Sequence, residues 1–167
     1  MAKRDRDADG AGPEAPVEVG TVRPFRQSLP MLLMRARETV MSRFRPHLRS
    51  HGVTEQQWRI LRVLAEHHQV ELLELSARCL IQPPSLSRTV PALVERGLVN
   101  RELHPEDHRR VLVSLTGEGQ ELFDTMAAES ARIYAEIEAE LSAAGLMEIY
   151  SMLSDLVDVL GAPESDA

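Results

Sequence analysis

Hydroxyl and guanidinium side chains gather between residues 83 and 110 of this 167-residue chain. They begin directly after the pair Pro83-Pro84 and recur at a polar turn. With the second proline, the set is Pro84, Ser85, Ser87, Arg88, Thr89, Arg109 and Arg110. Arginine can hold a phosphate or a guanine edge through two parallel hydrogen bonds, and serine and threonine can contact bases or phosphates. Pro84 and Thr89 add apolar surface that suits a thymine methyl group. The residue types therefore suit DNA, provided that the fold presents them on one surface.

A helix must carry the first part of this cluster. Pro83 belongs in a first helical turn, and Gly97 suits the left-handed residue that ends a helix. A shorter helix over residues 72–79 precedes it, so the pair predicts a helix-turn-helix whose second helix enters the major groove. Pro91 lies in the middle of that second helix and predicts a kink, at about 3 kcal/mol if nothing compensates for it.

The second part of the cluster lies on a predicted hairpin. Residues 98–103 and 111–115 alternate in part between apolar and polar side chains, as strands do, and residues 105–110 form the turn between them. A hairpin in this place is a wing, which would bring Arg109 to a narrow minor groove. An ordinary exposed charged turn is the alternative interpretation, and its ion pairs would contribute little.

The charge of the chain is sorted along its length. The net charge of −7 by itself disfavours a nucleic-acid partner. Residues 23–62 nevertheless hold nine arginines against two acidic residues, and residues 78–110 hold six against four. Residues 116–167 hold twelve acidic residues against one arginine. A basic binding face is therefore compatible with an acidic mean.

The composition predicts a soluble globular protein of the cytoplasm. The chain is 43% hydrophobic and 27% charged, and it has no apolar run long enough for a membrane helix. The first ten residues lack the apolar segment of a secretory signal. The single cysteine, Cys79, fits a reducing compartment.

Helices are predicted on both sides of the winged unit. Phe25 to Ser50 form the first, which Pro46 should kink or end, and Thr54 to Gln57 make a capping box for the next. Thr116 caps a long helix that breaks at Gly145 before a last one. The fold class is mainly α with a small β-hairpin wing.

The predicted organisation is a core region between two tails. Residues 1–22 and 161–167 are the tails, and residues 54–115 are the winged helix-turn-helix. The helices in residues 23–50 and 116–160 carry apolar stripes, which a symmetric homodimer would bury. Packing within one chain is the alternative.

Several short runs of residues resemble the MarR family of bacterial regulators. The runs are Leu98-Val99-x-Arg101, Asp107-x-Arg109, Val113-x-Leu115-Thr116 and Gly117-x-Gly119. Ala36-Arg37-Glu38, Phe44-Arg45-Pro46 and the run Thr54 to Arg59 look like the subgroup named for regulating homoprotocatechuate degradation. The resemblance implies control of aromatic-acid catabolism, repression or activation being left open, and binding to a palindromic operator. It also implies that Asp107 pairs with an arginine such as Arg101 to support the wing.

The resemblance further implies a small-molecule pocket beside the dimerisation helices. A pocket for an aromatic carboxylate needs apolar walls and one or two cationic donors. The candidates from the segments expected there are Arg35, Arg37, His51, Trp58 and Arg62. Taken singly, Trp58 also suits a core position, and the arginines also suit a solvated face or contacts with the DNA backbone.

Other chemistry is weaker in this sequence. His47 and His51 have the spacing of helical metal ligands, but no third ligand is evident nearby, and His104 and His108 with Asp107 are a similar cluster. We therefore expect no metal and no cofactor. No motif indicates an enzyme. The rival functions are a winged helix that binds proteins and a redox switch through Cys79. In the family that this chain resembles, cysteine sensors carry their cysteine in the first helix, where this chain has none.

Overall fold

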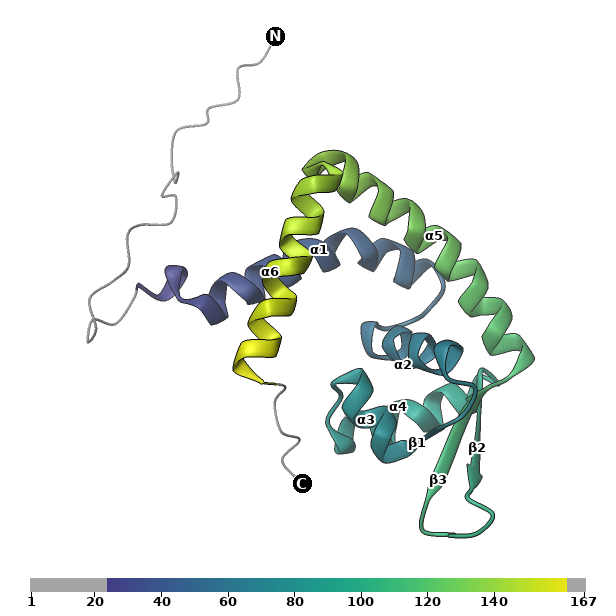
Figure 1. Cartoon of the computed structure of the whole chain (residues 1–167). Helices are drawn as coiled ribbons and strands as arrows, with labels where there is room; N and C mark the ends of the chain where they lie inside the picture. The colour runs from purple at the N-terminus through teal and green to yellow at the C-terminus, as the bar shows by residue number, and fades with distance from the viewer. Residues whose placement is uncertain (1–23, 162–167) are drawn as a thin grey trace. The chain divides into compact units, whose positions relative to one another are not determined.

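The computed structural model describes residues 24–161. Within them, six α-helices and one three-stranded antiparallel sheet confirm the mainly α fold with a small wing (Figure 1). In chain order the elements are a 3₁₀ turn (Phe25–Gln27), α1 (Leu29–Ser50), α2 (Glu55–Glu66), β1 (Val70–Glu71), α3 (Leu72–Cys79), α4 (Pro83–Glu95), β2 (Val99–Leu103), β3 (Val111–Leu115), α5 (Gly117–Leu141) and α6 (Ala143–Leu160). The predicted tails lie outside the described residues, except for Gly161. None of the described helices is long and apolar enough to cross a membrane.

The first long helix crosses the boundary between two compact units of the chain, which lies between Val40 and Met41. Of the two outcomes predicted at Pro46, a kink or an end of the helix, the end is wrong, because α1 continues to Ser50 as its predicted range does. Pro46 lies on the exposed side of α1, where water can compensate for the missing backbone donor. The chain turns at Gly52, whose φ of 62° is the left-handed conformation that glycine adopts at least cost.

The second helix begins at the predicted capping box. The Gln57 amide donates to Thr54 Oγ1 over 3.2 Å, and the Thr54 amide donates to Gln57 Oε1 over 2.9 Å. These two bonds satisfy donors that a helix start otherwise leaves unpaired. The helix then buries an apolar face that includes Ile60 and Leu61. Its face forms the centre of the core, together with buried residues of α3, α4, β2, β3 and α5: Leu75, Leu86, Val90, Leu93, Val99, Val113 and Met126.

The sheet has one strand more than the sequence predicts. β1 pairs with β3, with Val70 opposite Val113, so the order is β1-β3-β2 and β3 is central. Two residues are too few to show the alternation by which strands are recognised, so β1 left no signal. Val70, Val99 and Val113 are buried, and they direct one face of the sheet into the core.

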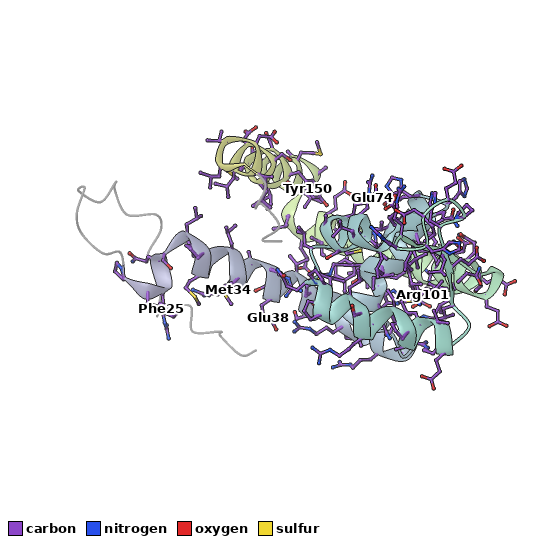
Figure 2. The ribbon with its side chains drawn as sticks, turned by 90° about the horizontal axis from the view of Figure 1, so that it is seen from below. Phe25, Met34, Glu38, Glu74, Arg101 and Tyr150 are labelled. Atoms are coloured by element: carbon purple, nitrogen blue, oxygen red, sulfur yellow. The ribbon has the colours of Figure 1, made fainter. Side chains whose placement is uncertain are left out.

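The last two helices meet three residues before the predicted break. Ser142, with φ of 65°, separates α5 from α6, and its Oγ accepts from the Gly145 amide over 3.2 Å. Gly145 therefore lies in the first turn of α6 rather than between the helices. α6 packs against α5 and leaves most of its side chains exposed, Tyr150 among them (Figure 2).

Gly119 provides the closest backbone approach in the junction between wing and α5. A Cβ atom at this position would lie 2.0 Å from the carbonyl oxygen of Leu98. A Cβ atom at Gly117 would have no neighbour within 4 Å. Thr116 bridges the same junction, since its Oγ1 donates to the Gly97 carbonyl over 2.6 Å and accepts from the Gly119 amide over 3.0 Å.

We predict that Gly119→Ala lowers the free energy of unfolding by about 1–3 kcal/mol, because backbone atoms must move to admit the methyl group. Gly117→Ala, two residues away in the same turn, is the matched control and should change stability by less than about 0.5 kcal/mol. Urea denaturation followed by circular dichroism measures both. Equal effects from the two variants would contradict the close packing of α5 on Leu98.

Candidate nucleic-acid interface

The turn between α3 and α4 is held by side-chain hydrogen bonds to its carbonyl oxygens. The Arg59 guanidinium of α2 donates to the carbonyl oxygens of Cys79 and Leu80, at 2.7 and 3.2 Å. Ser76 Oγ donates to the Ile81 carbonyl over 2.6 Å. Leu80 itself has φ of 49°, a left-handed conformation that a residue with a Cβ adopts only at a cost. These contacts satisfy carbonyls at the end of α3 and fix where α4 begins.

α4 has an apolar face and a polar face. Leu86, Val90 and Leu93 are at most 1% exposed, and they pack the helix against α2, α3 and β2. The opposite face carries the residues predicted to contact DNA. Pro84, Ser87 and Arg88 are exposed, and Ser85 and Thr89 are half-buried: Thr89 Oγ1 donates to the Ser85 carbonyl over 2.8 Å.

Pro91 does not interrupt α4, which continues to Glu95. Its side chain is exposed on the polar side of the helix. Because proline has no backbone N–H, the Ser87 carbonyl does not receive the usual bond from four residues along the chain. Ser87 is itself exposed, so solvent or a ligand can hydrate that carbonyl.

The wing is supported by a different set of contacts from the one expected. Asp107 Oδ1 accepts from the Arg109 amide over 3.0 Å, and no ion pair joins Asp107 to Arg101 within residues 24–161. Arg110 instead forms a two-pronged pair with Glu71 of β1: its Nε donates to one carboxylate oxygen over 2.8 Å, and a terminal nitrogen donates to the other. Arg110 thus ties the wing to β1, and its guanidinium is already engaged.

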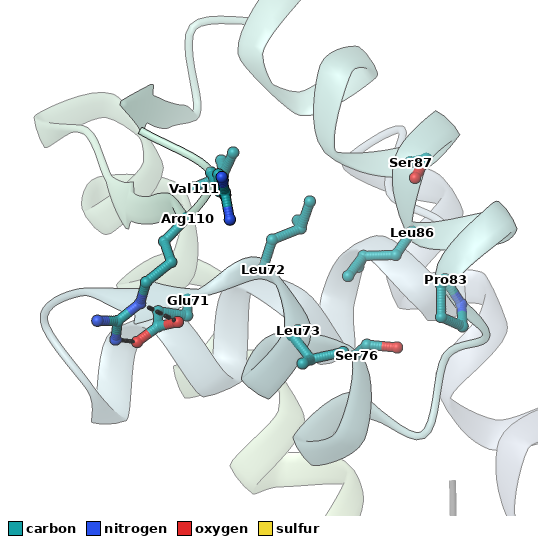
Figure 3. A pocket seen from close by; sticks show the side chains of 10 residues that line it. Glu71, Leu72, Leu73, Ser76, Pro83, Leu86, Ser87, Arg110 and Val111 are labelled. Atoms are coloured by element: carbon teal, nitrogen blue, oxygen red, sulfur yellow. Dashed lines mark hydrogen bonds and ion pairs between the residues drawn. The ribbon is translucent and has the colours of Figure 1, made fainter. Parts of the chain in front are cut away.

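A hollow of about 300 Å³ lies between α3, the start of α4 and the base of the wing. Ser87 and Pro83 of α4 border it on one side, and Arg109 and Arg110 border it from the wing. Figure 3 shows the Arg110–Glu71 pair across the hollow from Ser87 and Pro83. The fold therefore brings together side chains that lie more than twenty residues apart in the sequence. The Arg109 side chain is exposed and forms no hydrogen bond or ion pair with the described residues.

The residues predicted to hold a small ligand fall into two groups. Arg35 and Arg37 are exposed on the part of α1 before Val40. In the other unit, Trp58 is buried, with its ring stacked on Phe123 at 5.6 Å, whereas Arg62 is exposed one turn further along α2. His51 is half-buried and hydrogen-bonded to Glu129 of α5.

Sequence reasoning missed two features of this region. It did not place His47 beside Trp58, and it did not include Glu129. The rings of His47 and Trp58 meet edge to face at 6.3 Å. Hydrogen bonds from His51 and His47 hold the pKa of the Glu129 carboxyl below its ordinary value. The apolar periodicity of α5 could reveal Phe123, but nothing in the sequence pairs Glu129 with histidines about 80 residues earlier.

Cys79 lies in the core, with 2% of its surface exposed. Burial raises the pKa of its thiol to about 11 from the ordinary 9.0, against a smaller opposite effect of the Arg59 guanidinium. Since the thiolate is the reactive form, this environment suppresses both nucleophilic attack and oxidation.

We predict that iodoacetamide at pH 8 modifies Cys79 in the native protein roughly 100-fold more slowly than in urea, because folding both buries the thiol and keeps it protonated. Mass spectrometry follows the label, and Cys79→Ser is the blank. Rapid native labelling, joined to a peroxide response that Cys79→Ser abolishes, would favour the redox switch instead.

A helix-turn-helix whose second helix leads into a three-stranded wing is a winged helix-turn-helix. Residues 51–110 match the model of the MarR family. The homoprotocatechuate degradative operon repressor of Escherichia coli is 35% identical over 142 residues, which are 85% of this chain and 96% of that protein. The regulator FarR of Neisseria gonorrhoeae is also 35% identical, over 80% of this chain and 91% of its own.

A solved structure gives the same result. The crystal structure of NadR in complex with 4-hydroxyphenylacetate superposes with a TM-score of 0.69 at 34% identity, over 81% of this chain and 96% of that one. This chain belongs to the MarR family. It is a transcriptional regulator, as its relatives are.

Proposed function

We propose that the protein is a homodimeric repressor that binds a palindromic operator and releases it when a small aromatic carboxylate binds. The observation that carries the proposal is the shared hollow, which Ser87 of α4 and Arg109 of the wing both border. A recognition helix and a wing presented together can contact a major groove and the minor groove beside it.

The roles of the DNA-contacting residues follow from exposure and chemistry. Arg88 is exposed near the start of α4 and is the best candidate for a two-pronged contact with guanine. Pro84, Ser85, Ser87 and Thr89 surround it with hydroxyl and apolar surface. Arg109 is proposed to enter the minor groove. Arg110 is proposed to act mainly through the Glu71 pair, with Arg101 and Asp107 shaping the rest of the wing.

Dimerisation is supported by the apolar surface of the outer helices. Exposed apolar side chains lie along α6 and, in the other unit, along the first turns of α1: Leu29, Leu32, Met34, Met147, Met152, Val157, Val159 and Leu160. Surfaces of this kind are usually covered by a partner, and a two-fold pair of identical chains is the commonest solution. Two recognition helices related by that axis would read two half-sites about one helical turn apart.

The effector class is supported by two relatives and by the chemistry around α2. One relative represses a homoprotocatechuate degradative operon, and NadR was crystallised with 4-hydroxyphenylacetate. In this chain Trp58 and Phe123 provide a stacked aromatic wall, and Arg62 is an exposed cation on the same side of α2. We propose that Arg62 and His51 bind the effector carboxylate beside that wall. Arg35 and Arg37 belong to the other unit and are separate candidates for contact with an anionic ligand.

The central test is binding to the DNA upstream of the protein's own gene, measured by fluorescence anisotropy at several salt concentrations. We predict that Arg109→Ala weakens binding about tenfold and lowers the salt slope by about 1, because one positive charge beside the phosphates that flank the minor groove is lost. Arg132→Ala, an exposed arginine of α5, is the control and should leave both quantities unchanged. An unaltered salt slope for Arg109→Ala would overturn the wing assignment.

The effector proposal is tested with hydroxylated benzoates, phenylacetates and heteroaromatic acids added to the same complex. We expect one class to release the DNA, and Arg62→Ala to require about 10–100-fold more of it, since a hydrogen bond to a charged group contributes about 1.5–3 kcal/mol. Arg62→Lys, which keeps the charge but not the two-pronged geometry, should fall between. Equal responses from wild type and Arg62→Ala would exclude this residue from the effector site.

A further inference from the structure

Two histidines and one carboxylate converge where the end of α1 meets α5. His47 Nδ1 lies 2.7 Å from Glu129 Oε2, and His51 Nε2 lies 3.2 Å from the same oxygen. All three ligand atoms lie within 4.8 Å of one another. The sequence gives two of these residues at helical spacing, and the fold adds the third from a position 78 residues beyond His51.

We propose that His47, His51 and Glu129 form a binding site for a divalent transition-metal ion, Zn²⁺ being the best match. Two imidazole nitrogens and one carboxylate oxygen are a donor set that Zn²⁺ prefers over Mg²⁺ and Ca²⁺, which take oxygen ligands. Three protein ligands leave one tetrahedral position for water or another small ligand.

The three ligand atoms, which lie within 4.8 Å of one another, must shift to hold the ion. Zn²⁺ bound at about 2.0–2.1 Å places neighbouring tetrahedral ligands about 3.3 Å apart. The His51–Glu129 separation of 3.2 Å already meets this spacing, and the His47–Glu129 separation of 2.7 Å must widen. The Glu129 side chain is 41% exposed, so it can withdraw without disturbing the core. The same exposure gives a metal ion a path from solvent.

A neighbouring hydroxyl prepares His47 as a ligand. Ser130 Oγ lies 3.2 Å from His47 Nε2, and both residues are buried. An imidazole that donates its Nε2 hydrogen to Ser130 presents the lone pair of Nδ1 toward Glu129 and His51. Metal-binding histidines usually have such a partner, because it fixes the tautomer and the ring orientation. The Trp58 ring packs edge to face against the His47 ring and limits its rotation further.

A simple ion pair is the alternative reading of the same contacts. Without a metal, each histidine can donate to Glu129 only when the ring nitrogen facing the carboxylate carries a hydrogen. His47 then has both ring nitrogens occupied by hydrogen bonds, to Glu129 and to Ser130. A metal ion takes the place of the hydrogen at each ring nitrogen that faces Glu129, so one ion satisfies all three side chains.

The chain offers a matched control for this site. His104 and His108 have the same four-residue spacing, with Asp107 between them, but they do not converge with a third ligand among the described residues. His104 Nδ1 instead accepts from the Glu106 amide over 3.2 Å. The two pairs therefore have the same spacing in the sequence. Within the described residues, only His47 and His51 meet a third ligand.

The test is titration of the chelator-treated full-length protein with Zn²⁺ by calorimetry and with Co²⁺ by visible absorbance, both at pH 7.5. We expect one ion per chain, an intense tetrahedral Co²⁺ spectrum and a rise in Tm with Zn²⁺. Glu129→Gln and His51→Ala should weaken binding at least tenfold, within the range known for lost ligands or their supporting groups. His104→Ala/His108→Ala should bind as tightly as wild type.

Two outcomes would overturn the proposal. If the wild type shows no saturable Zn²⁺ or Co²⁺ binding, the cluster is an ion pair only. If Glu129→Gln and His51→Ala bind as tightly as wild type, the metal lies elsewhere. Glu129→Gln preserves the size of a half-exposed side chain, so misfolding does not confound this variant as it could His47→Ala. None of these readouts uses DNA or an effector acid, so failure of the metal site and failure of the proposed regulatory function are measured separately. His51 is the one residue that both proposals use, and Glu129→Gln tests the metal site without it.

Discussion

Burial of one face of α4 is the constraint on which the candidate interface depends. Leu86, Val90 and Leu93 lie in the core against α2, α3 and β2, so the intervening residues must face outward. On a helix of 3.6 residues per turn, this places Ser87 and Arg88 on the surface, where Arg88 Nε also donates to the Pro84 carbonyl over 3.3 Å. Arg59 sets where the helix begins, because it binds the carbonyls at the end of α3. If these three side chains did not pack in the core, α4 would no longer be oriented with its polar residues outward.

The wing depends on the same core through its strands. Val113 of the central strand is fully buried, and β1 and β2 pair on either side of it. The Arg110–Glu71 pair and the close approach of Gly119 to Leu98 join the hairpin to its neighbours on both sides. An isolated two-stranded hairpin is only marginally stable in water. These attachments explain how an exposed turn can hold Arg109 at a fixed position relative to α4.

The local features of this fold could be predicted from the sequence, whereas several long-range contacts could not. The capping box at Thr54, the start of α4 at Pro83 and the strands of the wing follow from residue types at short spacing. The two-residue β1 was too short to leave a pattern. The partners of Arg110 and of the histidine pair lie 39 and about 80 residues away, and no periodicity records such pairings. The same limit applies to Asp107 and Arg101, which were expected to pair and form no ion pair among residues 24–161.

A footprint of the protein on its operator tests the central claim most directly, since the claim is that α4 and the wing contact adjacent grooves. Hydroxyl radicals report backbone protection, and dimethyl sulfate reports guanine N7 in the major groove. We predict two symmetric guanine-protected patches about one helical turn apart, each flanked by a protected minor groove that Arg109→Ala exposes. A single asymmetric patch, or backbone protection without any guanine protection, would contradict a dimer that reads its operator through α4.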